Sequence, residues 1–260
     1  MTDQAPARVS IITPSYNQAH FLEETLLSVL GQDYPNIEYI VIDGGSSDGS
    51  VEILQKYAGR LAYWQSRPDK GQTDAINQGF ARASGDILAW LNSDDLLLPG
   101  AVRAAVAELQ AHPEVGMVYG DCQLINAEGK LIGRFPAAQT DLKKLRRGYV
   151  HIPQQASFFR ASLWKEVAPL DDSFYFAMDY DLWTRLAARA PLRFVPQTWA
   201  CFRLHNNAKS IAADDRCWPE MLRVHYRDGG KALSPIVFKY WLRKAGRPLL
   251  MWRRRRQLQD

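Results

Sequence analysis

The sequence predicts an α/β fold in which helices flank a mostly parallel sheet. Apolar runs of strand length alternate with segments whose apolar residues recur at helical spacing, and the connections between them are short. The run 87–91 is almost wholly apolar and ends abruptly at the polar tip Asn92-Ser93-Asp94-Asp95. Such a strand is typical of parallel sheets, which are buried on both faces and bind ligands at the carboxyl ends of their strands.

The regular alternation covers the first half of the chain. Strands are expected at 9–13, 37–42, 61–65, 87–91 and 115–119, and helices at 21–30, 51–57, 73–83 and 99–111. Successive parallel strands require right-handed crossovers through these helices.

The second half, about 122–230, is less regular. Asn126-Ala127-Glu128-Gly129 predicts a hairpin-like turn. A helix is expected at 179–189, and strands at 192–195 and 199–204. Because no linker separates the halves, we expect one domain over residues 1–230, with its regular half at about 8–121.

Charge is distributed unevenly along the chain. Residues 231–260 hold nine Lys or Arg and one acid, so residues 1–230 carry four more acids than bases although the whole chain is +4. A mildly acidic body argues against a nucleic-acid groove across it. The three cysteines, an odd number without metal-ligand spacing, favour a reducing compartment. The start of the sequence is polar and lacks a signal-like apolar segment. No apolar run approaches the eighteen or so residues of a spanning helix, so none is expected.

The tail 231–260 interleaves aromatic residues with cations. Segments 235–244 and 248–256 have the composition of amphipathic helices that lie on an anionic membrane surface. The alternative is a solvated basic tail whose aromatic residues pack back on the body.

The two carboxylates of the tip predict a cation site. Buried charge is costly unless it is paired, and hard divalent cations prefer oxygen ligands. Mn²⁺ or Mg²⁺ holding a diphosphate is therefore the first hypothesis for Asp94 and Asp95. The alternative is that one of them caps the following helix.

Four separated motifs give this chain a family resemblance. They are Thr13-Pro14-Ser15-Tyr16-Asn17, Asp43 in a Gly/Ser loop, the tip 92–95, and Met178-Asp179-Tyr180-Asp181-Leu182-Trp183. In this order, over residues 10–210, they resemble glycosyltransferase family 2, the inverting GT-A enzymes that use nucleotide-diphosphate sugars. The resemblance makes 8–121 the nucleotide-binding half and 122–230 the acceptor half.

The resemblance implies a nucleotide pocket at the first two strand ends. Asp43 would accept a hydrogen bond from the base, which suits the imide of uracil or thymine, and Thr13, Pro14 and Tyr16 would line the same pocket. Turn formation is the alternative for Asp43. Asp74 and Asn77 share a helix face and match polar positions directed at the nucleotide, although an exposed face is the alternative.

The resemblance also assigns the tip. Asn92, Ser93 and Asp94 replace the family's Asp-x-Asp motif, so Asp94 is left as the strong metal ligand, with Asn92 and Ser93 near the nucleotide. Asp95 is a supporting partner or a helix cap. His205 matches a late histidine that contacts metal or diphosphate in some GT-A enzymes.

The resemblance identifies Asp179 as the catalytic base, with Met178 in place of the family's Glu. A carboxylate is needed because the acceptor hydroxyl must lose its proton as it attacks. Helix capping is the alternative for Asp179 or Asp181. Gln154 and Gln155 are expected on the acceptor side, whereas Trp90, Phe158, Phe159 and Trp183 are expected in the core.

Together these features predict a metal-dependent hexosyltransferase. It would move a sugar from a UDP- or dTDP-linked donor to a saccharide or lipid-linked acceptor in bacterial polysaccharide or glycolipid assembly, at the cytoplasmic face of the membrane. A sugar-phosphate nucleotidyltransferase is one alternative, but it would carry a basic Gly-rich loop where this chain has 14–17. A non-catalytic nucleotide-sugar-binding protein is the other.

Overall fold

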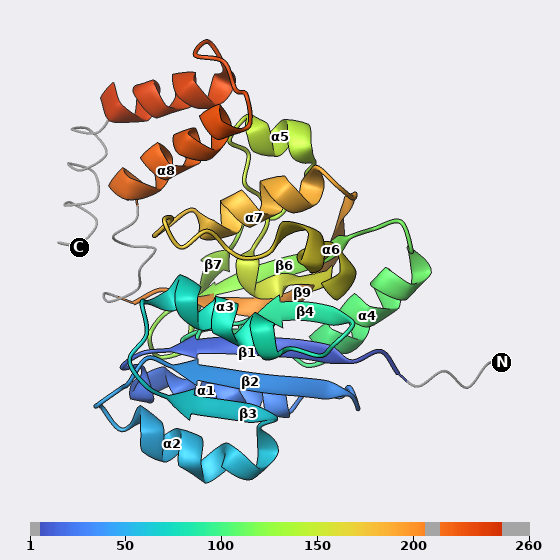
Figure 1. The fold of residues 1–260 in the computed structure, drawn as a ribbon, viewed down its shortest axis with the longest axis vertical. Helices are drawn as coiled ribbons and strands as arrows, with labels where there is room; N and C mark the ends of the chain where they lie inside the picture. Colours follow the sequence, from blue (N-terminus) through green and yellow to red (C-terminus); the bar gives the residue numbers. More distant parts are fainter. Residues whose placement is uncertain (1–5, 206–213, 246–260) are drawn as a thin grey trace.

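The computed structural model describes residues 6–205 and 214–245, which form one nine-stranded sheet covered by helices (Figure 1). The strand order is β3-β2-β1-β4-β8-β6-β9-β5, and β7 pairs with β6 outside this path. The strands are β1 (Val9–Ser15), β2 (Ile37–Asp43), β3 (Tyr63–Ser66), β4 (Ile87–Trp90), β5 (Leu96–Leu97), β6 (Met117–Ile125), β7 (Leu131–Arg134), β8 (Ser157–Arg160) and β9 (Leu192–Arg203).

The helices lie between these strands and at the end of the described chain. They are α1 (Ala19–Leu30), α2 (Ser50–Tyr57), η1 (Ala58–Arg60), α3 (Gln72–Arg82), α4 (Ala101–Ala111), α5 (Leu142–Arg146), η2 (Gln154–Ala156), α6 (Ala161–Val167), α7 (Met178–Ala187) and α8 (Asp214–Arg227). A further helix covers 235–245. In the part of the chain that is described, no helix combines the length and hydrophobicity needed to cross a bilayer.

The α/β prediction is confirmed, and the parallel arrangement holds for the first half. β1 pairs in parallel with β2 and β4, and β2 pairs in parallel with β3. In the second half β8 runs antiparallel to both β4 and β6. The sheet as a whole is therefore mixed, which corrects the expectation of a mostly parallel sheet.

The strands expected at 192–195 and 199–204 form one strand, β9. The apolar pattern breaks at Pro196-Gln197, where the pairing between β6 and β9 shifts register between Tyr119 and Cys122. A bulge interrupts the sequence pattern without ending the strand. β9 thereby continues to Arg203, at the edge of the sheet where β4 ends.

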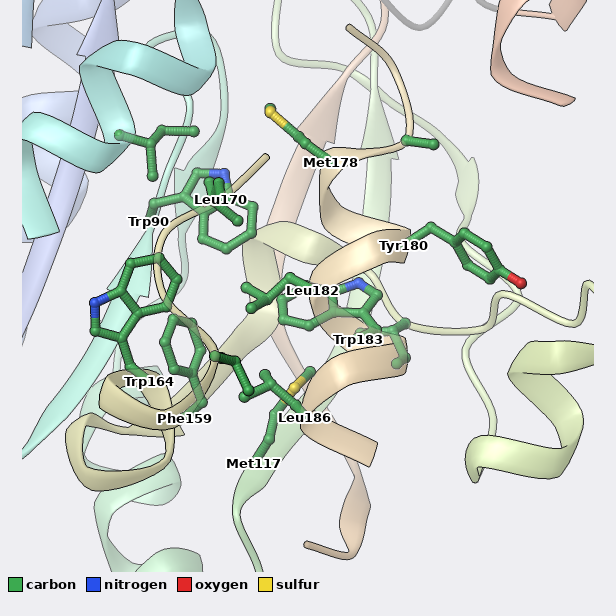
Figure 2. Packing of buried hydrophobic residues seen from close by; sticks show 14 of the residues in the cluster. Trp90, Met117, Phe159, Trp164, Leu170, Met178, Tyr180, Leu182, Trp183 and Leu186 are labelled. Atoms are coloured by element: carbon green, nitrogen blue, oxygen red, sulfur yellow. The ribbon is translucent and has the colours of Figure 1, made fainter. Parts of the chain in front are cut away.

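Two apolar clusters fill the two faces of the sheet. α1, α2 and α4 pack on one face, and α3, α6 and α7 on the other. On the second face the rings of Trp90 and Trp183 stack with centroids 5.6 Å apart, and Phe159 meets both edge-on (Figure 2). The expected core role of these aromatic residues is confirmed. Their packing holds α7 over the carboxyl end of β4.

The bulge gives a stability prediction at Gly120. In Gly120→Ala the new Cβ would lie 2.5 Å from a ring atom of buried Trp199 and 2.6 Å from the Gln197 carbonyl oxygen. We expect the free energy of unfolding in urea to fall by about 1–3 kcal/mol. Gly59→Ala is the control, because no atom lies within 4 Å of its added Cβ. Equal losses in the two variants would contradict close packing at the bulge.

Candidate active site

The first wall of the site is the loop after β2. Asp43 is fully buried and accepts hydrogen bonds from the N–H groups of Gly45 (3.1 Å) and Ser46 (2.9 Å), and from the hydroxyls of Ser46 (2.5 Å) and Ser66 (2.6 Å). Its carboxylate therefore stabilises the turn after β2, which is the alternative role that the sequence suggested for Asp43. Contact with a base remains a prediction for Asp43.

The end of β1 lies beside this loop, since Ser15 pairs with Asp43. The Thr13 hydroxyl faces the interior and bonds to the Tyr39 hydroxyl at 2.9 Å, and Pro14 is buried. The Tyr16 ring is 63% exposed at the rim. The sequence did not single out Ser15, whose hydroxyl is buried here without a hydrogen-bond partner in the described structure. It is a polar atom at the nucleotide end of β1.

The tip after β4 is held by an amide network. Asn92 accepts from the Gln72 side chain at 2.7 Å and directs its own amide toward Gln154 (3.3 Å) and Asp95 (3.4 Å). Gln154 in turn donates to the Trp90 carbonyl at 2.6 Å. Asn92 and Gln154 thus order the tip, and neutral Asn92 supplies a donor to Asp95 that a carboxylate could not supply.

The two residues predicted to hold metal lie together. The Oδ2 of Asp94 and the Nε2 of His205 are 3.0 Å apart, and both side chains are largely buried. Adjacent ligands of an octahedral cation with bonds of about 2.1 Å are separated by about 3 Å. The two groups form a hydrogen bond with each other here, and an oxygen and a nitrogen at this spacing would also fit neighbouring positions on a shared Mn²⁺ or Mg²⁺. Within residues 6–205 and 214–245 no group of three or more His, Cys, Asp and Glu has metal-binding spacing.

Asp95 has a different role from Asp94. It is fully buried, and it accepts the Arg203 backbone N–H at 2.9 Å. Burial, and secondarily the charge of Asp94, raise the pKa of Asp95 well above its usual value. Neither acid caps a helix, because α4 starts at Ala101 after Gly100. The cap alternative is therefore wrong, and Asp95 supports the tip.

Arg203 is a site residue that the sequence reading missed. Its side chain is 1% exposed, and its Nε donates to the Asp94 carbonyl at 2.9 Å. One terminal nitrogen donates to the Ala127 carbonyl at 3.0 Å, and the other pairs with Glu24 at 2.5 Å. The sequence feature that could have predicted its role is the position of a cation inside the otherwise apolar run 199–204.

The predicted base lies in the first turn of α7. Asp179 is partly exposed, and its Oδ1 accepts the Tyr180 N–H at 2.6 Å. Asp181 is fully buried and forms ion pairs with Arg185 (2.8 Å) and Arg227 (2.5 Å). Asp181 therefore has a structural role.

The start of α7 needs no aspartate cap. Its N-cap position is Ala177, and no side chain caps it there. The Glu220 carboxylate instead accepts the N–H groups of residues 175–177 at 2.8–3.1 Å. Neither Asp179 nor Asp181 therefore occupies the N-cap position, although Asp179 accepts the first-turn N–H of Tyr180.

The start of α3 links the tip to the start of α7. Gln72 bonds to Asn92, and the next residue, Thr73, places its hydroxyl 2.9 Å from the sulfur of Met178, the neighbour of Asp179. The structure therefore brings the tip and the predicted base to one edge of the sheet. This edge is the carboxyl end of the parallel strands.

The other two predicted residues of α3 have local partners. Asp74 accepts the backbone N–H of Lys70 and the amide of Gln78. Both polar ends of the Asn77 amide bond to the Leu170 backbone at 2.9 Å. Asn77 thus joins α3 to the loop before α7, and this contact occupies the groups that were expected to face the nucleotide.

The fold is shared with solved glycosyltransferases. Staphylococcus aureus TarS 1–349, in complex with UDP-GlcNAc, matches with a TM-score of 0.65 and 18% identity, over 84% of this chain and 65% of that chain. Mannosyltransferase PcManGT from Pyrobaculum calidifontis, in complex with GDP-Man and Mn²⁺, matches with a TM-score of 0.65 and 22% identity, over 91% of this chain and 71% of that chain. The fold is thus that of the GT-A glycosyltransferases.

Sequence comparison gives the family. The model of glycosyl transferase family 2 matches residues 10–167. Uncharacterized glycosyltransferase Rv1514c of Mycobacterium tuberculosis is 40% identical over 239 residues, covering 87% of this chain and 88% of the relative. Uncharacterized glycosyltransferase RC0461 of Rickettsia conorii is 29% identical, covering 78% of this chain and 35% of the relative. The chain belongs to glycosyl transferase family 2.

The amide network makes Asn92→Asp a test of the tip. The substitution removes the hydrogen-bond donor to the fully buried Asp95. It also adds a third carboxylate next to those of Asp94 and Asp95. Without metal, we expect the free energy of unfolding to fall by about 1–3 kcal/mol. Bound Mn²⁺ should restore part of this loss.

Asn126→Asp is the matched control, because the Asn126 side-chain oxygen accepts one N–H in an exposed turn and the carboxylate can do the same. Urea unfolding of both variants with and without Mn²⁺ makes the comparison. If both variants were equally stable, the neutral amide at position 92 would have no role in stabilising the tip.

Proposed function

We propose that this enzyme transfers a hexose from a UDP- or dTDP-linked donor to an acceptor hydroxyl, with inversion at the anomeric carbon and with a divalent metal. The observation that carries the proposal is the Asp94–His205 pair, 3.0 Å apart where β4 and β9 end. Family membership supports glycosyl transfer over the nucleotidyltransferase alternative. Retention of Asp43, Asp94 and Asp179 argues against a non-catalytic binding protein.

The donor would lie along the carboxyl ends of β1, β2 and β4. The loop that Asp43 organises would receive the base, with Tyr16 at its rim and Ser15 beneath it. The TarS and PcManGT structures contain UDP-GlcNAc and GDP-Man, respectively, which supports a nucleotide-sugar donor for this fold. Thr13, Asp74 and Asn77 would act indirectly, through the contacts that shape this edge.

Asp94 and His205 would hold the metal against the donor diphosphate. When bound, the cation supplies positive charge that stabilises the departing nucleotide diphosphate. PcManGT was solved with Mn²⁺, which supports a divalent metal in this fold. Arg203 would keep Asp94 in place, because its guanidinium bonds to the Asp94 carbonyl.

Asp179 would remove the proton of the acceptor hydroxyl as the oxygen attacks the anomeric carbon. The base must face the acceptor side, opposite the leaving diphosphate, if configuration is to invert. Asp179 is the partly exposed residue of an otherwise buried first turn of α7, and the contact between Thr73 and Met178 holds this turn near the tip, which supports this role. Asp181 is the poorer candidate, because two arginines already pair with it.

We further propose a saccharide or lipid-linked acceptor at the cytoplasmic face of an anionic membrane, in polysaccharide or glycolipid assembly. The basic, aromatic composition of 231–260 supports this location. Of that segment, residues 246–260 lie outside the described structure.

The metal role predicts the behaviour of Asp94→Ala. In the wild type, Mn²⁺ with UDP should raise the melting temperature more than UDP alone, because ligands that bind the folded state stabilise it. In Asp94→Ala the Mn²⁺-dependent part should disappear. The unliganded fold should persist, since Arg203 bonds to the backbone at position 94.

Asp86→Ala is the control, because Asp86 precedes the other end of β4, where it accepts the Arg8 N–H. This variant should keep the Mn²⁺-dependent shift. A shift retained in Asp94→Ala would overturn the metal assignment. His205→Gln should lower the Mn²⁺ dependence without removing the carboxylate.

The base role predicts that Asp179→Asn loses chemistry but not donor binding. General-base catalysis contributes about 10²- to 10⁴-fold, so the rate of sugar transfer should fall by that factor. The melting temperature and UDP affinity should stay near wild type. Transfer to a bacterial lipid extract and hydrolysis of the donor must be measured separately, because water can replace the acceptor.

Asp181→Asn is the paired variant. It removes the charge that pairs with Arg185 and Arg227, so it should lose stability, while its transfer rate below the melting temperature falls much less. The reverse pattern, with near-normal transfer in Asp179→Asn and loss in Asp181→Asn, would assign the base to Asp181.

A further inference from the structure

Helix 235–245 has two different faces. Ile236 and Val237 are buried and attach the helix to the body, whereas Phe238, Trp241 and Leu242 are 65%, 56% and 56% exposed. The spacing 238, 241, 242 puts these three residues on one side of the helix. A helix whose buried contacts are already satisfied therefore presents a second apolar stripe to solvent.

Three cations lie on the same helix as this stripe, and the Lys244 ammonium is 5.0 Å from the centre of the Trp241 ring. Lys239 is half-buried, and Arg243 and Lys244 are exposed. The Lys239 ammonium lies 3.1 Å from the centre of the Tyr149 ring, and Arg243 lies over Trp218 at 5.3 Å. Large apolar side chains bordered by cations and aromatic rings are typical of helices that lie at a membrane interface.

A second basic segment lies beside this helix, although about 90 residues separate the two in the sequence. Lys143, Lys144, Arg146 and Arg147 are all exposed, while Leu145 between them is fully buried. Figure 1 shows α5 at the same end of the molecule as α8 and the last described helix. The sequence reading attributed the basic surplus to the tail alone and overlooked this segment.

Direct contacts join the two segments. Lys239 donates to the Arg147 carbonyl at 3.2 Å. A Cβ added to Gly148 would lie 3.1 Å from the Ile236 side chain, so the backbone after α5 packs closely on the helix. Between them lies an open hollow of about 310 Å³, lined by Gly148, Trp218, Lys239, Leu242 and Arg243. Segments 142–147 and 235–245 together carry seven cations and no carboxylate.

We propose that α5 with residue 147 and helix 235–245 form one composite surface that docks on the anionic headgroup layer of a membrane. The exposed cations would face lipid phosphates, and Phe238, Trp241 and Leu242 would enter the acyl boundary. The exposed apolar stripe favours a lipid layer as the partner. Binding to a nucleic acid would need only the cations, which neutralise its phosphates. This surface is formed by described residues alone. The sequence of 246–260 contains five further arginines.

The surface is connected to the proposed active site through α7. The Tyr180 hydroxyl donates to the Leu145 carbonyl of α5 at 2.9 Å, and Tyr180 follows Asp179 directly. In Figure 2 the Tyr180 ring points away from the aromatic cluster around Trp183. Docking through α5 would therefore hold the base-bearing end of α7 near the membrane. The docking extends the membrane location proposed above, whereas this last step also rests on the proposed transfer reaction with Asp179 as its base.

The test is co-sedimentation of the full-length protein with vesicles of phosphatidylcholine alone or with one-third phosphatidylglycerol, at low and high salt. The wild type should bind the anionic vesicles, more weakly at high salt. Each basic residue near an anionic surface contributes about fivefold in affinity. Lys143→Gln with Arg146→Gln should therefore weaken binding about 25-fold at low salt, although both changes lie outside the tail.

Lys56→Gln with Arg60→Gln is the matched control, since it removes the same charge from α2 and η1, which lie far from α5 (Figure 1). Its vesicle binding should stay within about fivefold of wild type. Phe238→Ser with Trp241→Ser should weaken the binding that persists at high salt. Melting temperatures near wild type would show that the variants remain folded, because all the replaced side chains are on the surface.

Several outcomes would overturn the proposal. Wild-type protein that does not sediment with anionic vesicles excludes membrane docking. Unchanged binding in Lys143→Gln with Arg146→Gln removes α5 from the surface and leaves the tail alone. Equal losses in the α2 control indicate attraction by net charge only. Tighter binding to a short DNA duplex than to the vesicles assigns the surface to nucleic acid. None of these measurements needs donor or acceptor, so they are independent of the transfer reaction.

Discussion

The arrangement of the proposed active-site edge depends on the hydrogen bonds and the ion pair of the buried Arg203 guanidinium. The guanidinium connects the end of β9 to the tip after β4, to the turn between β6 and β7, and to Glu24 on α1. These elements come from four distant parts of the sequence. A buried cation is costly unless its N–H groups are paired, and here backbone carbonyls and the partly exposed Glu24 pair them. His205 follows two residues later, so the cation that fixes the Asp94 backbone also sets where the imidazole can lie.

Burial divides the acids of this edge into two groups. Asp43, Asp95 and Asp181 are fully buried, and each is held by backbone N–H groups, hydroxyls or arginines that belong to the fold. Asp94 and Asp179 are only partly buried and lie at the tip and in the first turn of α7. A carboxylate that is fully used inside the protein cannot also bind a cation or accept a proton from a substrate. The fully buried acids therefore form the frame, and the two partly buried acids are the ones that we propose for chemistry.

The sequence was most informative where interactions are local. The alternation of strands and helices, the turn at 126–129 and the aromatic core around Trp90 were all predictable from spacing and composition. The antiparallel entry of β8 was not, because strand direction within a sheet depends on tertiary packing. The role of Asp181 depends on Arg227, which is 46 residues away, and that pairing leaves no pattern in a single sequence. The contact of Asn77 with the Leu170 backbone, 93 residues away, was not predictable for the same reason.

α7 links the core, the site and the surface. Trp183 stacks on Trp90 and Asp181 pairs with arginines of α7 and α8, so the body of the helix is fixed to the fold. Its first turn instead contacts the start of α3 through Met178 and α5 through Tyr180. The hydrogen bond of Tyr180 therefore links α5 directly to the turn that carries Asp179. This coupling places the proposed base where events at the basic surface and at the donor tip meet.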